Sequence, residues 1–217
     1  MNLEYLSDIL GYTGIGSSCL PILFCFFIYS NQAKKYPFRV LFFVSILYFV
    51  SNVLTLLLFL FTSVNQNLLI NLHSSIEFFL LVIFYKWILK GYNIGRYLNF
   101  IIPLFLLILG ATILNFGFNE NYTFLNVSQK FGLLIFSLLY LYYAYNSSAY
   151  DKLTDSPYFW INVSVLLYNA SSIYISIFEN FLRDENIEAF YMLWPLLQIS
   201  GICYYSLFSF GLWKLKN

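Results

Sequence analysis

Long apolar stretches alternate with short polar breaks along the whole chain. Seven of these stretches contain about 20 mainly apolar residues each, which is the length that a helix needs to cross a bilayer. In lipid every backbone N–H and C=O group must pair within the segment, and this requirement favours helices over irregular structure. We therefore predict an all-α membrane protein, a bundle of seven transmembrane helices that forms a single domain over residues 1–217. The expected helices span residues 9–29, 40–62, 68–89, 97–116, 127–145, 158–178 and 190–213.

Composition agrees with this class. Hydrophobic residues make up 60% of the 217 residues and charged residues only 10%, whereas a soluble domain typically carries ~25% charge. The net charge of +1 provides no broad positive field, so we expect no direct contact with nucleic acid. The amino-terminal sequence MNLEYLSD is acidic instead of basic, which indicates a retained first helix and not a signal peptide.

Basic residues alternate between the two sides of the predicted membrane. The amino terminus and the second, fourth and sixth connections contain Lys130 and Arg183 as their only basic residues, beside seven acidic ones. Nine basic residues lie in the other connections and the carboxyl terminus: Lys34, Lys35, Arg39, Lys86, Lys90, Arg96, Lys152, Lys214 and Lys216. By the positive-inside rule, the amino terminus lies outside and the carboxyl terminus lies in the cytoplasm. The residue usage is typical of bacteria, so we expect a multi-pass protein of the inner (plasma) membrane.

Six of these residues define a basic cytoplasmic face, namely Lys34, Lys35, Arg39, Lys86, Lys90 and Arg96. Clusters of Lys and Arg next to transmembrane helices attract anionic lipid headgroups and acidic protein surfaces. Besides the surrounding bilayer, we expect the partner of this face to be a cytoplasmic protein or an anionic lipid. The pattern is also compatible with an oligomer.

The stretch NLHSSIEFF places the single histidine of the chain, His73, four residues before Glu77 on a predicted helix. The spacing puts both side chains on one helix face, and the rise per residue puts Glu77 ~13 Å below the outer end, near the membrane midplane. Other polar residues fall at a similar depth on three further helices. We predict an interior polar cluster formed by Asn52, His73, Glu77, Tyr168, Asn169 and Gln198.

The sixth predicted helix supports an interior polar face. Asn162, Asn169, Ser172 and Ser176 follow one another at spacings of seven, three and four residues. These spacings put all four on one side of a helix, so we expect that side to face the bundle interior.

A carboxyl group at membrane depth costs less free energy in its neutral form, so the proton of Glu77 is the central question. His73 is its nearest expected partner. A proton shared by these two residues resembles the relays of pumps and transporters, whereas a satisfied hydrogen-bond network only holds helices together. The sequence leaves both interpretations open.

Several enzyme mechanisms lack the residues that they need. A catalytic zinc ion normally has three protein ligands, and these are often histidines, whereas this chain contains one histidine. An intramembrane aspartyl protease needs two aspartates at membrane depth, but all four aspartates lie in termini or connections. Ser74 and Ser75 follow His73 by one and two residues, so they point along different faces of the helix from His73. We therefore expect no enzymatic activity, no metal and no cofactor.

Three stretches of the chain resemble a known group of proteins. They are HSSIEFFLLVIFY (residues 73–85), SPYFWINVSVLLYNAS (156–171) and LWPLLQISGICYYSLFSFGLW (193–213). They look like uncharacterised seven-transmembrane-helix proteins of Bacteroidota-type bacteria, which are often encoded beside two-component signalling genes. This resemblance implies a sensory or signalling module, and it transfers no catalytic residue.

Two alternative functions stay open. The first is a proton-coupled small-molecule transporter that uses His73 and Glu77. The second follows from a more distant resemblance to small multispanning proteins of bacterial defence loci, including CRISPR systems. It implies a membrane accessory protein or a pore-forming effector.

Overall fold

The computed structural model describes residues 3–32, 35–61, 67–90, 94–116, 123–147, 152–185 and 187–216. Within these ranges the chain forms eight α-helices and one short 3-10 helix, with no β-strand. The prediction of an all-α fold is therefore confirmed. In chain order the elements are α1 (Leu3–Ser17), α2 (Cys19–Gln32), α3 (Tyr36–Phe61), α4 (Asn67–Ile88), α5 (Ile94–Phe116), α6 (Thr123–Asn146), η1 (Leu153–Asp155), α7 (Pro157–Glu185) and α8 (Ile187–Lys214).

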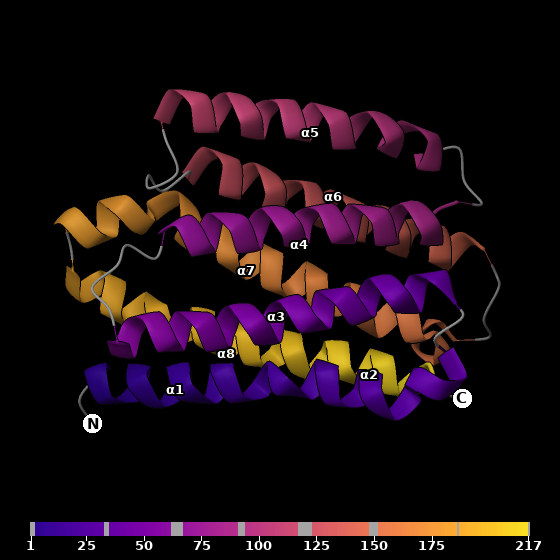
Figure 1. Ribbon diagram of the computed structural model, residues 1–217, viewed down its shortest axis with the longest axis horizontal. Coiled ribbons are helices and arrows are strands. Elements are labelled where there is room, and N and C mark those ends of the chain that lie inside the picture. The colour runs from indigo at the N-terminus through magenta and orange to yellow at the C-terminus, as the bar shows by residue number, and fades with distance from the viewer. Residues whose placement is uncertain are drawn as a thin grey trace.

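The α-helices run side by side along the long axis of the molecule (Figure 1). Helices α7 and α8 share the most extensive contact, and α8 also packs against α1 and α2. On the other side α4 contacts α3, α5 and α6, and α5 lies at the edge of the bundle. This arrangement places α4, α6, α7 and α8 around a common interior.

The first predicted helix is divided into α1 and α2 at Ser18. Pro21 has no backbone N–H and cannot pair with the carbonyl group of Ser17. The hydroxyl groups of Ser17 and Ser18 instead donate to the carbonyl oxygens of Gly14 and Ile15, at 2.7 and 2.6 Å. The backbone N–H of Ser18 also donates to the carbonyl oxygens of Gly14 and Ile15, both at 3.2 Å, so the helical path continues past the break.

The surface of the bundle is apolar and its interior holds polar side chains. Phe27, Leu107 and Leu114 are 78%, 72% and 88% exposed, whereas Asn162 and Ser172 are completely buried. Six stretches in the described part of the chain are long and apolar enough to cross a membrane. The protein is therefore a multi-pass membrane protein. Helix α5, which corresponds to the fourth predicted segment, contributes a shorter apolar stretch, Asn99–Thr112, so the count of seven crossings stays a prediction.

The polar face expected on the sixth predicted helix is confirmed in α7. Asn162, Asn169, Ser172 and Ser176 are all buried there. Aromatic and aliphatic side chains fill the rest of the interior, and Tyr48, Leu81, Phe84, Tyr85 and Phe208 are at most 1% exposed. These side chains belong to one connected hydrophobic core.

Candidate functional site

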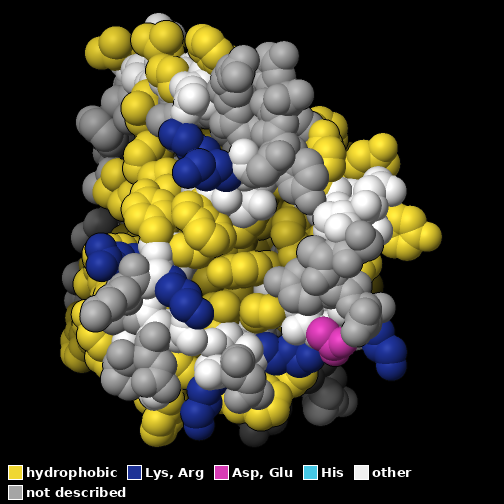
Figure 2. All heavy atoms as spheres, turned by 90° about the vertical axis from the view of Figure 1, so that its right-hand side faces the viewer, with side chains coloured by type: hydrophobic (Ala, Val, Ile, Leu, Met, Phe, Trp, Pro, Cys, Tyr) yellow, Lys and Arg dark blue, Asp and Glu magenta, His cyan; other side chains and the backbone are white. Residues whose placement is uncertain are grey.

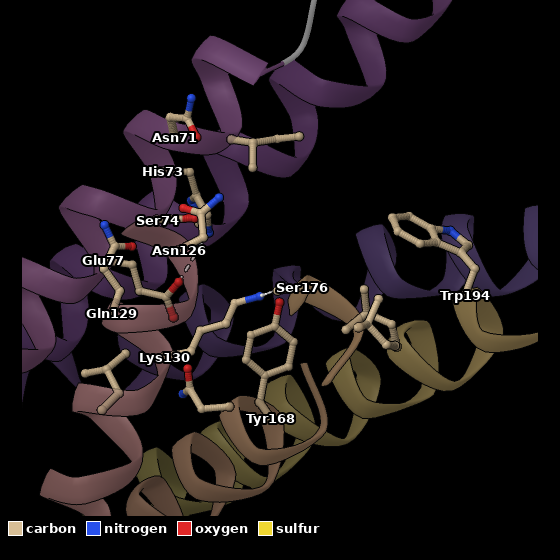
Figure 3. A pocket seen from close by; sticks show the side chains of 15 residues that line it. Asn71, His73, Ser74, Glu77, Asn126, Gln129, Lys130, Tyr168, Ser176 and Trp194 are labelled. Carbon is tan, nitrogen blue, oxygen red and sulfur yellow. Dashed lines mark hydrogen bonds and ion pairs between the residues drawn. The ribbon is translucent and has the colours of Figure 1, made fainter. Parts of the chain in front are cut away.

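A cavity of about 200 Å³ lies between α4, α6, α7 and α8 (Figure 3). Its lining residues come from the first halves of α4, α6 and α8 and from the middle and second half of α7. The cavity therefore lies toward one end of the bundle. Lys86 and Lys214 lie at the opposite end, in the last turns of α4 and α8. The polar residues of the cavity wall are Asn71, His73, Ser74, Glu77, Asn126, Gln129, Lys130, Tyr168, Asn169 and Ser176.

Glu77 joins three helices at the edge of this cavity. Its Oε1 accepts hydrogen bonds from the hydroxyl groups of Tyr48 on α3, at 2.9 Å, and Tyr204 on α8, at 3.2 Å. The two hydroxyl groups also contact each other, and their rings meet edge to face with centroids 5.3 Å apart. Both donors compensate for the loss of water around the carboxyl group. The carboxyl oxygen therefore has a fixed position.

His73 lies one turn before Glu77 on the same face of α4. Its Nε2 is 3.6 Å from Oε2 of Glu77, which is an ion-pair distance when the imidazole is protonated. Its Nδ1 is buried and has no hydrogen-bond partner among the described residues. Buried polar atoms of this kind normally bind a protein group, a water molecule or a ligand. His73 therefore has one ring nitrogen available for a molecule in the bundle interior.

Lys130 places a cation in the same cavity. In the comparison of charges it was counted with the fourth connection, although the expected helix 127–145 contains it. The structure corrects this count, because α6 begins at Thr123 and contains Lys130 about two turns from its start. Its Nζ donates to Oγ of Ser176 on α7 at 2.5 Å (Figure 3). Beside it, Nε2 of Gln129 donates to Oγ of Ser75 on α4 at 3.4 Å. The cavity thus carries a carboxyl group on α4 and an ammonium group on α6.

A second cavity of about 330 Å³ lies between α1, α3, α4 and α8, and His73 and Tyr168 line both cavities. Asn52 and Gln198 line only the second one. Asn52 donates to the hydroxyl oxygen of Tyr205 at 3.0 Å. Gln198 packs against Gly14, where an added Cβ would lie 3.2 Å from its Oε1.

The six residues of the predicted cluster therefore divide between two adjoining cavities. His73, Glu77, Tyr168 and Asn169 line the first. Asn169 is buried, and its side-chain amide donates to the carbonyl oxygen of Val165 in the same helix at 2.8 Å. Of the six residues, His73 and Glu77 form the one pair with a described ion-pair contact between their side chains.

The tyrosine partners of this region are not among the residues that the sequence predicted. Tyr48 precedes Asn52 by four residues on α3, and a helical spacing of four places both on one face. Tyr204 stacks on Tyr168 with ring centroids 4.9 Å apart. The spacing of Tyr48 and Asn52 was a usable signal, whereas the contact of Tyr168 with Tyr204 depends on how α7 and α8 pack.

A separate polar network lies between the cavity and the basic end. The hydroxyl group of Tyr85 donates to Oδ1 of Asn162 at 2.8 Å and lies 2.8 Å from Oγ of Ser137. The side-chain amide of Asn162 donates to the carbonyl oxygen of Ser137 at 3.1 Å. Because each of these side-chain polar groups has a partner, the network connects α4, α6 and α7 as a structural element.

The structure describes the side chains of four of the six residues that were predicted to form a basic cytoplasmic face. Lys35, Arg39, Lys86 and Lys90 are exposed. Figure 2 shows one end of the bundle, where basic side chains surround an apolar centre. Lys34 lies outside the described residues, and the structure describes Arg96 only through its backbone in α5. Nζ of Lys214 donates to the carbonyl oxygen of Thr154 at 2.7 Å. This face lies opposite the polar cavity.

No group of three or more His, Cys, Asp or Glu side chains is placed to hold a metal ion within the described part of the chain. The arrangement that is present can bind a polar molecule through an acid, an imidazole and an ammonium group. Comparisons with protein-family models, with curated proteins and with solved structures found no significant match to this chain.

Proposed function

We propose that this protein is a seven-pass sensory or signalling protein of the bacterial inner membrane, with its amino terminus outside and its carboxyl terminus in the cytoplasm. It is not an enzyme in this proposal. The observation that carries the proposal is the polar cavity with Glu77, His73 and Lys130 among helices that cross the membrane. Ionisable groups at membrane depth are costly, and they are typical of sites that recognise polar molecules or ions. The cavity is accordingly the receptor site.

The two ends of the bundle support the signalling role. Glu77 and Lys86 are both on α4, nine residues and about 13 Å apart along the helix. A ligand that moves α4 at the cavity also moves Lys86, because the helix between them is a continuous rigid element. The basic cytoplasmic face then presents the altered surface to a cytoplasmic protein or to anionic lipid.

Packing favours sensing over transport. Phe84 and Phe208 are completely buried between the cavity and the basic end, and Tyr85 is held there by Asn162 and Ser137. A proton-coupled transporter with His73 and Glu77 is the second candidate, and the 3.6 Å contact of these two residues supports it. The resemblance to proteins encoded beside two-component signalling genes supports sensing.

Proteoliposomes loaded with the pH-sensitive dye pyranine separate these functions. A sensor gives no proton flux above that of empty liposomes, for the wild type and for Glu77→Gln alike. Flux that the wild type carries and Glu77→Gln loses would establish the transporter. Leakage of small ions from vesicles containing either protein would instead establish a pore-forming effector.

Topology is tested with reporter fusions. Alkaline phosphatase fused after residue 65 or 120 is expected to be active, because both positions lie outside in this proposal. Green fluorescent protein fused after Lys90 or at the carboxyl terminus is expected to fluoresce in the cytoplasm. The opposite pattern at both kinds of position would contradict the proposed orientation.

A further inference from the structure

The second cavity lies between two helix pairs. Helix α1 packs on α8 and α3 packs on α4, whereas α1 and α3 make few contacts with each other (Figure 1). The α8 wall runs along one helix face from Trp194 to Tyr205, over ~16 Å. The cavity is therefore a slot that extends along α8. We propose that this slot is a second binding site, which takes a small uncharged molecule with hydroxyl groups on a ring, of the kind that a monosaccharide represents.

The charge of the wall favours an uncharged ligand. No Asp, Glu, Lys or Arg is among the described residues that line the slot. His73 lines it, but its Nε2 faces Oε2 of Glu77 at 3.6 Å. An ion that leaves water without a partner of opposite charge loses its hydration at a large cost in free energy. Neither Glu77 nor Lys130 lines the slot, so this inference goes beyond the proposed function and does not depend on it.

Uncharged polar side chains line the slot from α3, α7 and α8. The side-chain amide of Asn52 donates to the hydroxyl oxygen of Tyr205 at 3.0 Å. This bond leaves the side-chain carbonyl of Asn52 as an acceptor and the O–H of Tyr205 as a donor. In the described part of the chain, neither the amide of Gln198 nor the hydroxyl group of Tyr168 has a hydrogen-bond partner. The slot therefore offers both donors and acceptors to a ligand.

Hydroxyl groups match this mixture. Each hydroxyl group carries one donor and two acceptor lone pairs, so it can pair with either kind of group on the wall. A quinone supplies acceptors alone, and a lipid acyl chain supplies neither donors nor acceptors. Either of these would leave polar groups of the slot unpaired and away from water, which is unfavourable.

Volume and aromatic surface favour a single ring. The volume of about 330 Å³ is at the lower end of the range that small-molecule sites occupy, ~300–1,000 Å³. Trp194 lines the slot beside two tyrosines, and the C–H face of a six-membered ring packs on aromatic surface of this kind. Glycines keep the α1 and α8 walls open. A Cβ added at Gly11 or Gly201 would meet no atom within 4 Å.

Calorimetry on the wild-type protein in nanodiscs tests the ligand class. Glucose, galactose and mannose are the uncharged probes. The tightest of them is compared with its uronate and with its protonated amino sugar, which place one charge on the same ring. We expect each charged analogue to bind about a hundredfold more weakly, because the slot offers no opposite charge. Binding of none of the three sugars, or equal binding of a charged analogue, would overturn the proposal. Duroquinone that binds as tightly as the sugar would overturn the assignment to hydroxyl groups.

Space-filling variants place the ligand in the slot. The double variant Gly11→Ala/Gly201→Ala adds two methyl groups that narrow it, and the sugar should bind about tenfold more weakly. The control is Gly16→Ala/Gly110→Ala. Its two added methyl groups also meet no atom within 4 Å, but these glycines do not line the slot. Both double variants should melt at or above the wild-type temperature, because Ala favours a helix over Gly. Equal sugar affinities in the two double variants would overturn the proposal.

Polar variants test the hydrogen bonds. Gln198→Leu and Tyr168→Phe each remove one polar group from the wall, and each should weaken sugar binding about tenfold. Tyr142→Phe is the control, because Tyr142 is 63% exposed on α6 and should leave the affinity unchanged. A sugar affinity that survives in both wall variants would also overturn the proposal.

Discussion

Tyr48 on α3 donates its hydroxyl group to Oε1 of Glu77 on α4 across 2.9 Å. Tyr48 is 1% exposed, so this hydrogen bond lies in the interior of the bundle. Tyr204 on α8 donates to the same oxygen, so one carboxyl group connects three helices. The cavity therefore has one wall whose geometry is fixed before any ligand enters.

Removal of the Tyr48 hydroxyl group tests this connection. Tyr48→Phe should lower the free energy of unfolding by about 1 kcal/mol, the size expected for a hydrogen bond between membrane helices. Equilibrium unfolding in mixed detergent micelles measures the change. Tyr142→Phe is the matched control, because Tyr142 is 63% exposed on α6. An equal loss in the two variants would show that the contact with Glu77 contributes nothing to stability.

Asn162 provides a second test in the network below the cavity. Asn162→Leu keeps a similar volume but removes the acceptor of the Tyr85 hydroxyl group and the donor to the Ser137 carbonyl oxygen. We expect a loss of about 1 to 2 kcal/mol in the free energy of unfolding. The exposed Asn146, whose amide donates to the carbonyl oxygen of Tyr142 in its own helix, gives the control Asn146→Leu. A smaller loss for Asn162→Leu than for the control would contradict a structural role of the network.

The sequence predicted the residues that stand out chemically from their surroundings. A histidine and a glutamate in an apolar segment are costly in lipid, so their position alone indicated an interior site. Helical spacing on α7 also predicted the buried face of Asn162 and Asn169, because periodicity reports which side of a helix turns inward.

The partners of these residues could not be predicted in the same way. The chain contains 20 tyrosines, and nothing local distinguishes Tyr204 from a tyrosine at the membrane interface. Its contact with Glu77 depends on where the packing of α8 against α1, α2 and α7 places its side chains relative to α4. Lys130 lies inside the expected helix 127–145 but was counted with the fourth connection in the comparison of charges. Its contact with Ser176 depends on the packing of α6 against α7, which no local pattern predicts.

Close packing of α7 against α8 gives a third test, at Gly211. A Cβ there would lie 2.6 Å from Cγ1 of Ile161 and 2.9 Å from the carbonyl oxygen of Pro157. Because one of these contacts is backbone, the helices must separate, and Gly211→Ala should cost about 1 to 3 kcal/mol of stability. An added Cβ at Gly16 meets no atom within 4 Å, so Gly16→Ala should be neutral or slightly stabilising. Thermal unfolding in one detergent compares the two variants, and equal melting temperatures would contradict the close contact.

The basic cytoplasmic face should retain anionic lipid. Lys35, Lys86 and Lys90 are exposed beside the start of α3 and the end of α4, away from the cavity. A Lys near a membrane surface contributes about 1 kcal/mol to the attraction of anionic lipid. The triple variant with Gln at these positions should lose most of the phosphatidylglycerol that the wild type retains from mixed nanodiscs, as counted by native mass spectrometry. The triple Arg variant keeps each charge and should retain as much lipid as the wild type. If the Gln variant also retains wild-type amounts while its melting temperature is unchanged, the face does not select anionic lipid, and a cytoplasmic protein becomes its only proposed partner.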